Sequence, residues 1–353
     1  MEKRDPIGII YWGTRGGGNR FTFNLCMELL KLDLPFVLSL SASNENLISY
    51  KKTFPNHIQL FEYDTKFPNI ILTYLNRKSK TRDALKRFNQ FGVKNVLITM
   101  PHFLDLNVFR QAKRKSMIVT RVIHDYQKHP GDIWPNFFSI LKRRYASDKL
   151  VYLSRFVQAK CKFPNRKSIV ARFPEEHLFE TQIEETSKFK SCDVLIIGRI
   201  RKYKGLQVLG DLVNIINETT EVNFLLAGSG KTEMTEGRNL NIVERWLTES
   251  EFEELFLKTR IILLLHQEAS QSGVPSVATA NGKWIVAPEL GGLTEQVENG
   301  VNGFRYQIED MNSLKEAIFK ALRMEELGVL PTKANSESFS MSLVRFLELD
   351  NKL

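Results

Sequence analysis

Cysteine is scarce in this chain of 353 residues, which holds three thiols far apart, at Cys26, Cys161 and Cys192. An odd number of widely spaced cysteines excludes a disulfide framework and the paired spacing of a structural zinc site. We therefore expect the protein to work in a reducing compartment, the cytoplasm.

Long apolar runs are missing as well. No stretch approaches the roughly 18 uncharged apolar residues that a membrane-spanning helix needs. The short apolar run that starts at Ile7 has no small-residue cleavage site after it, so it predicts a strand and not a secretion signal.

Acidic residues are few in the first half. Residues 1–172 hold 31 Lys and Arg against 12 Asp and Glu, a net charge of +19, whereas residues 173–353 hold 19 against 28, a net of −9. This asymmetry suggests that the first half meets a polyanion or an anionic membrane surface, with a generally basic surface as the alternative. No RNP, helix-turn-helix or zinc-finger motif accompanies the charge, so we expect no nucleic-acid partner.

Strand-like and helix-like segments alternate through both halves of the chain. The apolar fraction of 42% suffices for sizeable cores, and the length suits two domains of about 150–200 residues each. We predict an α/β fold with two Rossmann-like domains that face each other across a cleft. The predicted division is a basic N-terminal domain at 1–174, a linker at 175–190, a C-terminal domain at 191–330 and a helix at 331–353 that packs on the N-terminal domain.

Two helix starts carry capping residues. Thr248 precedes an apolar-periodic segment and is predicted as an N-cap, and either Asn312 or Ser313 is predicted to cap the helix that follows.

One stretch in the second half predicts an anion site. The apolar run Val194–Ile197 ends at a glycine, four cations follow, and LQVLGDLVNII then begins a helical pattern. Ligands of open α/β sheets sit at the carboxyl ends of strands, where Arg and Lys suit a phosphate or diphosphate. A solvated basic turn is the alternative.

Four blocks in the second half resemble the GT-B glycosyltransferases of family 4. They are GRIRKYKG, LLAGSG, FEELFLKTRIILLLHQEASQSG and GKWIVAPELGGLTEQVENGVNGFRY, and together they cover about residues 193–322. The resemblance implies a GT-B fold and a retaining transferase of hexosyltransferase type that uses a nucleotide-diphosphate sugar. It also implies that Arg199 and Lys204 hold the donor diphosphate, and that no metal or other cofactor is needed.

The chain departs from this family at a pair of glutamates. Their expected positions hold Ala269 and Val277, with Glu268 one residue from the first. By the resemblance, Glu268 would contact sugar hydroxyls, and nothing supplies the second carboxylate. Some members carry a similar SQSG-type segment, which here would cradle phosphate and sugar, with helix capping by Gln271 and Ser272 as the alternative. The residues concerned are Gln271, Ser272, Gly273 and Val274.

In the first half, the resemblance rests on a glycine-rich loop and an HD segment. Gly16 and Gly17 allow close backbone approach to a ligand, although any tight turn explains them too. His124 would bond a sugar hydroxyl or the acceptor, and Asp125 is either an acceptor contact or a loop cap. A metal site with His129 and Asp132 is disfavoured, because Pro130 breaks the geometry and no cysteine joins them.

Trp246 lies where the family places a loop near the nucleotide base, so it either stacks on the base or fills the core. The basic runs at 110–115 and 142–144, with aromatic residues at 134–138, suit a membrane interface, or they belong to helices with an ordinary core face.

These observations lead to one main hypothesis. The protein transfers a sugar to a saccharide or lipid-linked acceptor in bacterial surface polysaccharide or glycoconjugate synthesis, as a cytoplasmic enzyme peripheral to the inner face of the plasma membrane. The alternative is a non-catalytic nucleotide-sugar-binding or partner subunit, which the broken glutamate pair suggests.

Overall fold

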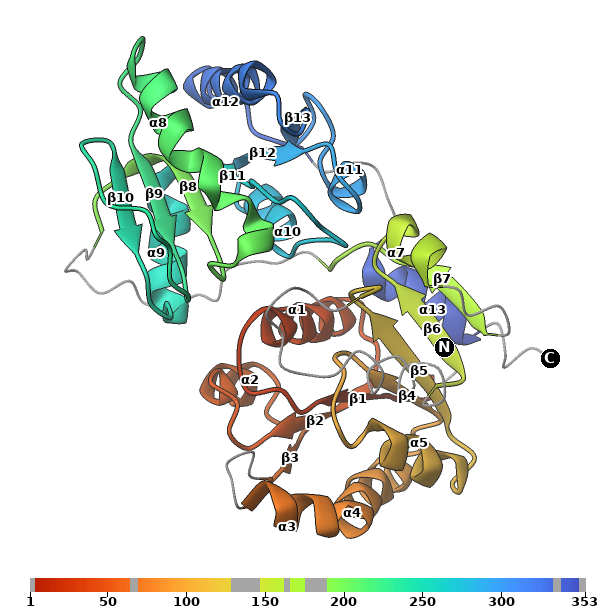
Figure 1. Ribbon diagram of the computed structural model, residues 1–353. Coiled ribbons are helices and arrows are strands. Elements are labelled where there is room, and N and C mark those ends of the chain that lie inside the picture. Colours follow the sequence, from red (N-terminus) through yellow and green to blue (C-terminus); the bar gives the residue numbers. More distant parts are fainter. Residues whose placement is uncertain are drawn as a thin grey trace. The chain divides into compact units, whose positions relative to one another are not determined.

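Two separate parallel β-sheets organise the chain in the computed structural model (Figure 1), which describes residues 4–63, 69–127, 147–161, 166–174, 189–332 and 338–348. Each sheet belongs to one compact unit. The first unit holds the described residues up to 174 together with 338–348, and the second holds 189–332. The prediction of two Rossmann-like α/β domains is confirmed.

The first unit contains a sheet of seven described strands in the order β3-β2-β1-β4-β5-β6-β7, all parallel. Its strands are β1 (Ile7–Tyr11), β2 (Phe36–Ser41), β3 (Ile58–Phe61), β4 (Asn95–Ile98), β5 (Ile118–Ile123), β6 (Lys149–Tyr152) and β7 (Lys167–Val170). Its helices are α1 (Gly17–Lys31), α2 (Leu47–Thr53), α3 (Asn69–Leu75), α4 (Arg77–Gln90), α5 (Asp105–Lys113), α7 (Arg155–Lys160) and α13 (Phe339–Glu348).

Helix α13 returns from the end of the chain and packs on this first unit. The amide and hydroxyl of Ser340 donate to one carboxylate oxygen of Glu28, at 3.0 and 2.7 Å. The Lys149 ammonium donates to the carbonyl of Phe346 at 3.0 Å. These bonds tie α13 to helix α1 and strand β6.

A buried ion pair ties β5 to the start of α5 in the same unit. The Arg121 guanidinium lies 2.5 Å from the Asp105 carboxylate, and both side chains are completely buried. Asp105 also accepts the amide hydrogen of His102 at 2.8 Å, so the pair fixes the loop that follows β4. Removing one partner of such a pair leaves an uncompensated buried charge.

The second unit contains six described parallel strands in the order β10-β9-β8-β11-β12-β13. They are β8 (Cys192–Ile197), β9 (Phe224–Ala227), β10 (Leu240–Val243), β11 (Thr259–Leu263), β12 (Trp284–Pro288) and β13 (Gly303–Tyr306). The helices are α8 (Leu209–Asn217), α9 (Glu249–Lys258), α10 (Val274–Ala280), α11 (Leu293–Gln296) and α12 (Met311–Glu326), with 3-10 turns at Lys202–Lys204 and Leu206–Val208.

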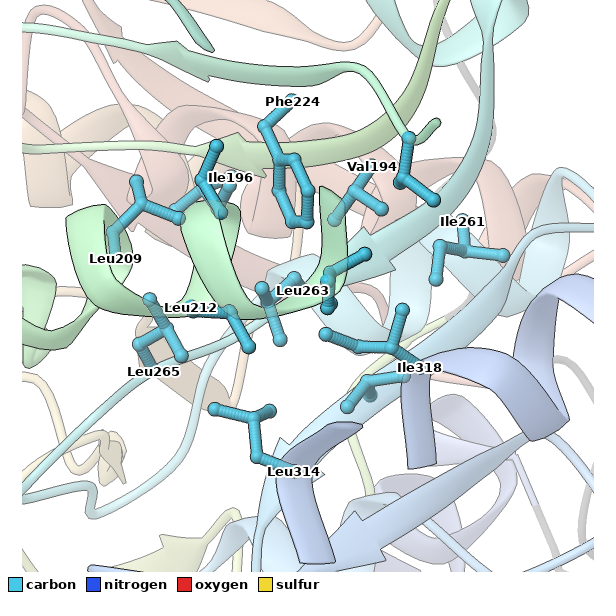
Figure 2. Packing of buried hydrophobic residues seen from close by; sticks show 14 of the residues in the cluster. Val194, Ile196, Leu209, Leu212, Phe224, Ile261, Leu263, Leu265, Leu314 and Ile318 are labelled. Carbon is cyan, nitrogen blue, oxygen red and sulfur yellow. The ribbon is translucent and has the colours of Figure 1, made fainter. Parts of the chain in front are cut away.

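The apolar run of β8 is explained by burial on both faces of this sheet. Val194 and Ile196 point to one face, where they pack with Leu209 of α8 and Ile318 of α12 (Figure 2). Leu195 and Ile197 belong to the core of the opposite face. Side chains alternate along a strand, so a strand covered by helices on both sides is apolar at every position.

The structure decides the two predicted caps. Thr248 is confirmed as the N-cap of α9, since it forms a reciprocal capping box with Glu251. The prediction for α12 is wrong, because the N-cap is Asp310, whose carboxylate accepts the amide hydrogen of Ser313 at 2.9 Å.

Candidate functional site

The loop after β8 presents Arg199 to solvent. The amide of Gly198 donates to the Ala227 carbonyl at 3.0 Å, and the amide of Ile200 donates to the Ser229 carbonyl at 2.8 Å, so the loop continues beside the loop after β9. Ile200 is buried, whereas the Arg199 side chain is exposed and forms no hydrogen bond or ion pair within the described ranges.

Close packing of backbone on backbone fixes the turn that carries Lys204. The turn ends at Gly205, which has a φ of 68°, and a Cβ atom there would lie 1.9 Å from the Leu265 carbonyl oxygen. The amide of Gln267 donates to the Tyr203 carbonyl at 2.8 Å. The turn therefore rests directly on the loop after β11, and only glycine permits this approach.

This contact brings Lys204 against His266. The Lys204 Nζ and His266 Nε2 atoms lie 2.6 Å apart, so one nitrogen donates to the other. His266 is buried. The pKa of Lys204 is lowered to about 7, mainly by the burial of its own amine and secondly by the positive charge of Arg199. In the free protein the amine of Lys204 is thus close to half protonated at neutral pH.

The sequence interpretation missed His266. The residue directly follows the apolar run of β11, and its sequence distance from Lys204 hides their contact. The sequence signal that could have found His266 is its place at the end of a predicted strand; β11 pairs with β8, and this pairing brings the loops after the two strands together.

Sheet topology supports this edge as a ligand site. Strand order in the second unit reverses between β8 and β11, the two strands whose loops carry Arg199, Lys204 and His266. In open α/β sheets, ligands bind outside the carboxyl ends of the strands at such a switch point. A small cavity lies there, lined by these three residues, Gly198 and apolar side chains.

The segment after His266 contains both exposed and buried residues. Glu268 is exposed, whereas Ala269 and Val277, where the sequence resemblance places the two glutamates, belong to the apolar core. Carboxylates in these two places would be buried among apolar side chains, and burial without a partner is costly. In this chain, Ala269 and Val277 therefore belong to the apolar core.

The backbone of Ser272 is held by one side chain. Its amide donates to Oε1 of Gln296 at 2.9 Å, and its carbonyl accepts from Nε2 of Gln296 at 2.7 Å. The Ser272 hydroxyl accepts the amide hydrogen of Val274 at 3.3 Å, and Gln271 is partly buried. Gly273 directly precedes α10, whose next residue after Val274 is a proline.

Trp246 is not a core residue, so that alternative was wrong. Its side chain is 39% exposed. Its neighbour Arg245 is engaged with Glu251 through two bonds of 2.7 and 2.8 Å, and this guanidinium lowers the pKa of the Glu251 carboxyl to about 2. Arg245 is therefore occupied by a structural ion pair, and Trp246 keeps a surface position beside α9.

In the first unit, the glycine-rich loop lies at the corresponding switch point, between β1 and β4. Gly16 has a φ of 85°, and its amide donates to the Glu45 carboxylate at 2.8 Å. Gly17 is exposed and has open space around its α-carbon, whereas a Cβ at Gly18 would meet Met100. Sequence reasoning did not foresee Glu45, which places a carboxylate at the amino end of α1.

His124 follows β5 at the same edge of the first sheet. Its Nε2 lies 2.8 Å from the Thr99 carbonyl oxygen, so this nitrogen donates. Its ring packs edge-to-face on Phe21, with centroids 5.0 Å apart. Asp125 is the next residue and is partly exposed. The structure thus brings His124 and the glycine loop to one edge within the first unit.

Several predictions fall outside the described residues. They concern His129 and Asp132, the aromatic residues at 134–138, the basic run at 142–144 and most of the linker at 175–190. Within the described part of the chain, no group of three or more His, Cys, Asp or Glu side chains has the geometry of a metal site. No described helix combines the length and apolar character needed to cross a bilayer.

Comparison with known proteins finds a family match that spans the described part of the second unit. Residues 179–337 match the family described as "Glycosyl transferases group 1". An uncharacterized glycosyltransferase of Methanocaldococcus jannaschii, MJ1178, is 23% identical over 320 residues, which are 83% of this chain and 87% of that protein.

Solved structures show the same fold over nearly the whole chain. Anabaena HepE in complex with UDP and glucose has a TM-score of 0.69 at 14% identity, covering 99% of this chain and 100% of HepE. Sucrose-phosphate synthase from Thermosynechococcus elongatus has a TM-score of 0.64 at 14% identity, with coverage of 99% and 100%. The chain thus contains a glycosyl transferase group 1 domain on a GT-B fold, and it is a glycosyltransferase.

Proposed function

We propose that this glycosyltransferase is a retaining enzyme of the family 4 type that takes its sugar from a UDP-sugar. The observation that carries the proposal is the pair of cations, Arg199 and Lys204, at the switch point between β8 and β11. The UDP and glucose held by HepE support the choice of donor.

The cations suit the departure of a diphosphate. As the bond between the sugar C1 and the diphosphate oxygen breaks, negative charge develops on the leaving group. Fixed positive charges beside it stabilise the transition state more than the ground state, and one such contact typically contributes about 2–4 kcal/mol to the barrier. Because these two side chains supply the charge, we propose that the reaction needs no metal ion.

The anomeric configuration is retained if the bond from C1 to the diphosphate breaks and the bond from C1 to the acceptor forms on the same face of the sugar. The acceptor oxygen bonds to C1 on the face that the diphosphate leaves, and the acceptor proton passes to a leaving phosphate oxygen. We assign Glu268 and His124 to sugar hydroxyls or the acceptor, Trp246 to the base, and the 271–274 segment to phosphate and sugar. Gly16, Gly17 and Asp125 are assigned to substrate contacts in the first unit.

The acceptor is proposed to be a saccharide or lipid-linked saccharide of bacterial surface polysaccharide synthesis, met at the inner face of the plasma membrane. The support is the charge of the first half, where residues 1–172 carry a net +19. Anionic lipid headgroups attract such a surface.

Two measurements test this function. A thermal-shift panel with UDP, GDP and ADP tests the donor base; UDP should raise the melting temperature most, since a ligand present at 100 times its dissociation constant stabilises by about 2.7 kcal/mol. Proton NMR of the transferred sugar, taken before the anomers equilibrate, tests the stereochemistry. An inverted anomeric configuration would refute the retaining mechanism.

A further inference from the structure

Helix α3 exposes an unusual row of large apolar side chains. Ile71, Leu72, Tyr74 and Leu75 are 49%, 58%, 52% and 64% exposed, whereas Thr73 between them is buried. Four large apolar side chains that project into water from one short helix form a contiguous patch, and such patches mark contact surfaces.

The next helix adds positive charge beside this patch. On α4, Lys78, Arg82 and Lys86 are exposed at a spacing of four residues, so they form a stripe along its outer face. The adjacent face of α4, with Leu85 and Phe88, is buried in the core of the first unit. Residues 77–90 hold six Lys and Arg against one Asp.

The patch lies at the functional edge of the first sheet. The Lys80 ammonium donates to the carbonyl of Glu62, which directly follows β3, so the first turns of α4 lie at the carboxyl end of that strand. Parallel strands place all their carboxyl ends on one edge, and the glycine loop and His124 lie on that edge too. In Figure 1, α3 and α4 are the consecutive helices beside β3.

Within the part of the chain that the structure describes, the basic run at 110–115 has no apolar patch beside it and lies at a different edge of the sheet. Residues 113–117 connect the end of α5 to the start of β5, so they lie at the amino edge of the sheet. Lys113 is paired with Asp148 at 3.1 Å, and residues 110–115 hold no large apolar side chain that is exposed.

We propose that α3 and the outer face of α4 dock on an anionic lipid surface. We define this α3 surface as Ile71, Leu72, Tyr74, Leu75, Lys78, Arg82 and Lys86. Aliphatic side chains enter the acyl boundary, a tyrosine suits the headgroup level, and cations pair with anionic headgroups. The ring of Tyr74 already lies 4.1 Å below the guanidinium of Arg77.

Charge decides against a second copy of the chain as the occupant. Two α3 surfaces facing each other would bring two basic stripes together, and like charges at an interface disfavour association. A bilayer with anionic lipid can bind both the apolar side chains of α3 and the cations of α4. One consequence of this inference rests on the proposed function: a lipid-linked saccharide acceptor would meet the enzyme at this edge of the sheet.

Vesicle sedimentation tests the α3 surface directly. The probes are vesicles of phosphatidylglycerol and phosphatidylcholine in equal parts, and vesicles of phosphatidylcholine alone. The test variant combines Ile71→Ser, Leu72→Ser and Leu75→Ser. The control combines Leu327→Ser and Leu330→Ser, two leucines of the second unit that are at least as exposed. Light scattering without lipid follows self-association of each protein.

The wild type and the control should bind the anionic vesicles, with weaker binding at high salt, and the test variant should bind at least tenfold more weakly. UDP release to water or to a soluble acceptor should be unchanged in the test variant, so a failure of the proposed function would not be confused with a failure of this one. The proposal would be overturned if the wild-type protein did not bind anionic vesicles, or if the test variant bound them as strongly as the wild type. Self-association that the triple substitution abolishes would overturn it in favour of a second copy.

Discussion

Donor binding should weaken as pH rises through neutrality, because Lys204 must be charged to hold a diphosphate. Burial, and secondly the charge of Arg199, lower the pKa of this amine to about 7 in the free protein. A bound diphosphate favours the charged amine, so the complex takes up a proton wherever the free amine is neutral. The sign is therefore fixed: affinity is highest below pH 7 and falls above it.

The magnitude follows from the same pKa. Between pH 6.0 and 8.5, the charged fraction of an amine with a pKa of 7 falls about 30-fold, which corresponds to about 2 kcal/mol of binding free energy. The diphosphate diester of a UDP-sugar keeps its charge over this range. At pH 7.5, binding should take up most of one proton, because most of the free amine is then neutral.

Isothermal titration calorimetry with UDP-glucose, in two buffers of different ionisation enthalpy, measures both quantities. Lys204→Arg keeps its charge at every pH used and should remove the pH dependence. Arg199→Gln should weaken binding but shift the midpoint to higher pH, because one cause of the lowered pKa is gone. A dissociation constant that stays level from pH 6.0 to 8.5, with no proton uptake, would refute the reasoning.

Three further predictions follow from packing, burial and the proposed chemistry. Gly205→Ala should lower the free energy of unfolding in urea by roughly 2 kcal/mol or more and abolish most transfer, because its Cβ would clash with the Leu265 carbonyl. Gly17→Ala should fold normally, because the space around that α-carbon is open. Arg121→Met should lower the free energy of unfolding by about 3–5 kcal/mol in the same assay, because it removes the cation from a completely buried ion pair with Asp105; a loss below 1 kcal/mol would contradict this account of the ion pair. EDTA in excess should leave the initial rate of UDP release unchanged, and a rate restored only by Mg²⁺ or Mn²⁺ would show that a metal takes part.

The sequence was sufficient to predict the two α/β units and the position of Arg199 and Lys204 after a buried strand. Apolar runs that end at glycines, with helical periodicity between them, predict parallel strands at β8 and β9, because burial on both faces makes a strand apolar throughout. The Thr248 cap was predictable because a cap depends on residues within one turn.

The remaining features depend on contacts between distant segments. His266 meets Lys204 only because β8 and β11 are neighbours in the sheet, and Glu45 reaches Gly16 across the loops after β1 and β2. The exposure of Trp246 and of α3 depends on which elements cover them, and local periodicity does not report that. The cap of α12 shifted to Asp310 because neighbouring polar residues compete for the same backbone amides.

The most direct test of the central claim is the rate of UDP release from a UDP-sugar by Lys204→Met against its neighbour Lys202→Met. Both lysines lie in the same 3-10 turn, but Lys202 is exposed and Lys204 lies against His266 in the cavity. We predict a loss of 10²–10³-fold, or about 3–4 kcal/mol, for Lys204→Met and a near wild-type rate for Lys202→Met. Equal rates for the two variants would show that the loop after β8 does not hold the leaving group.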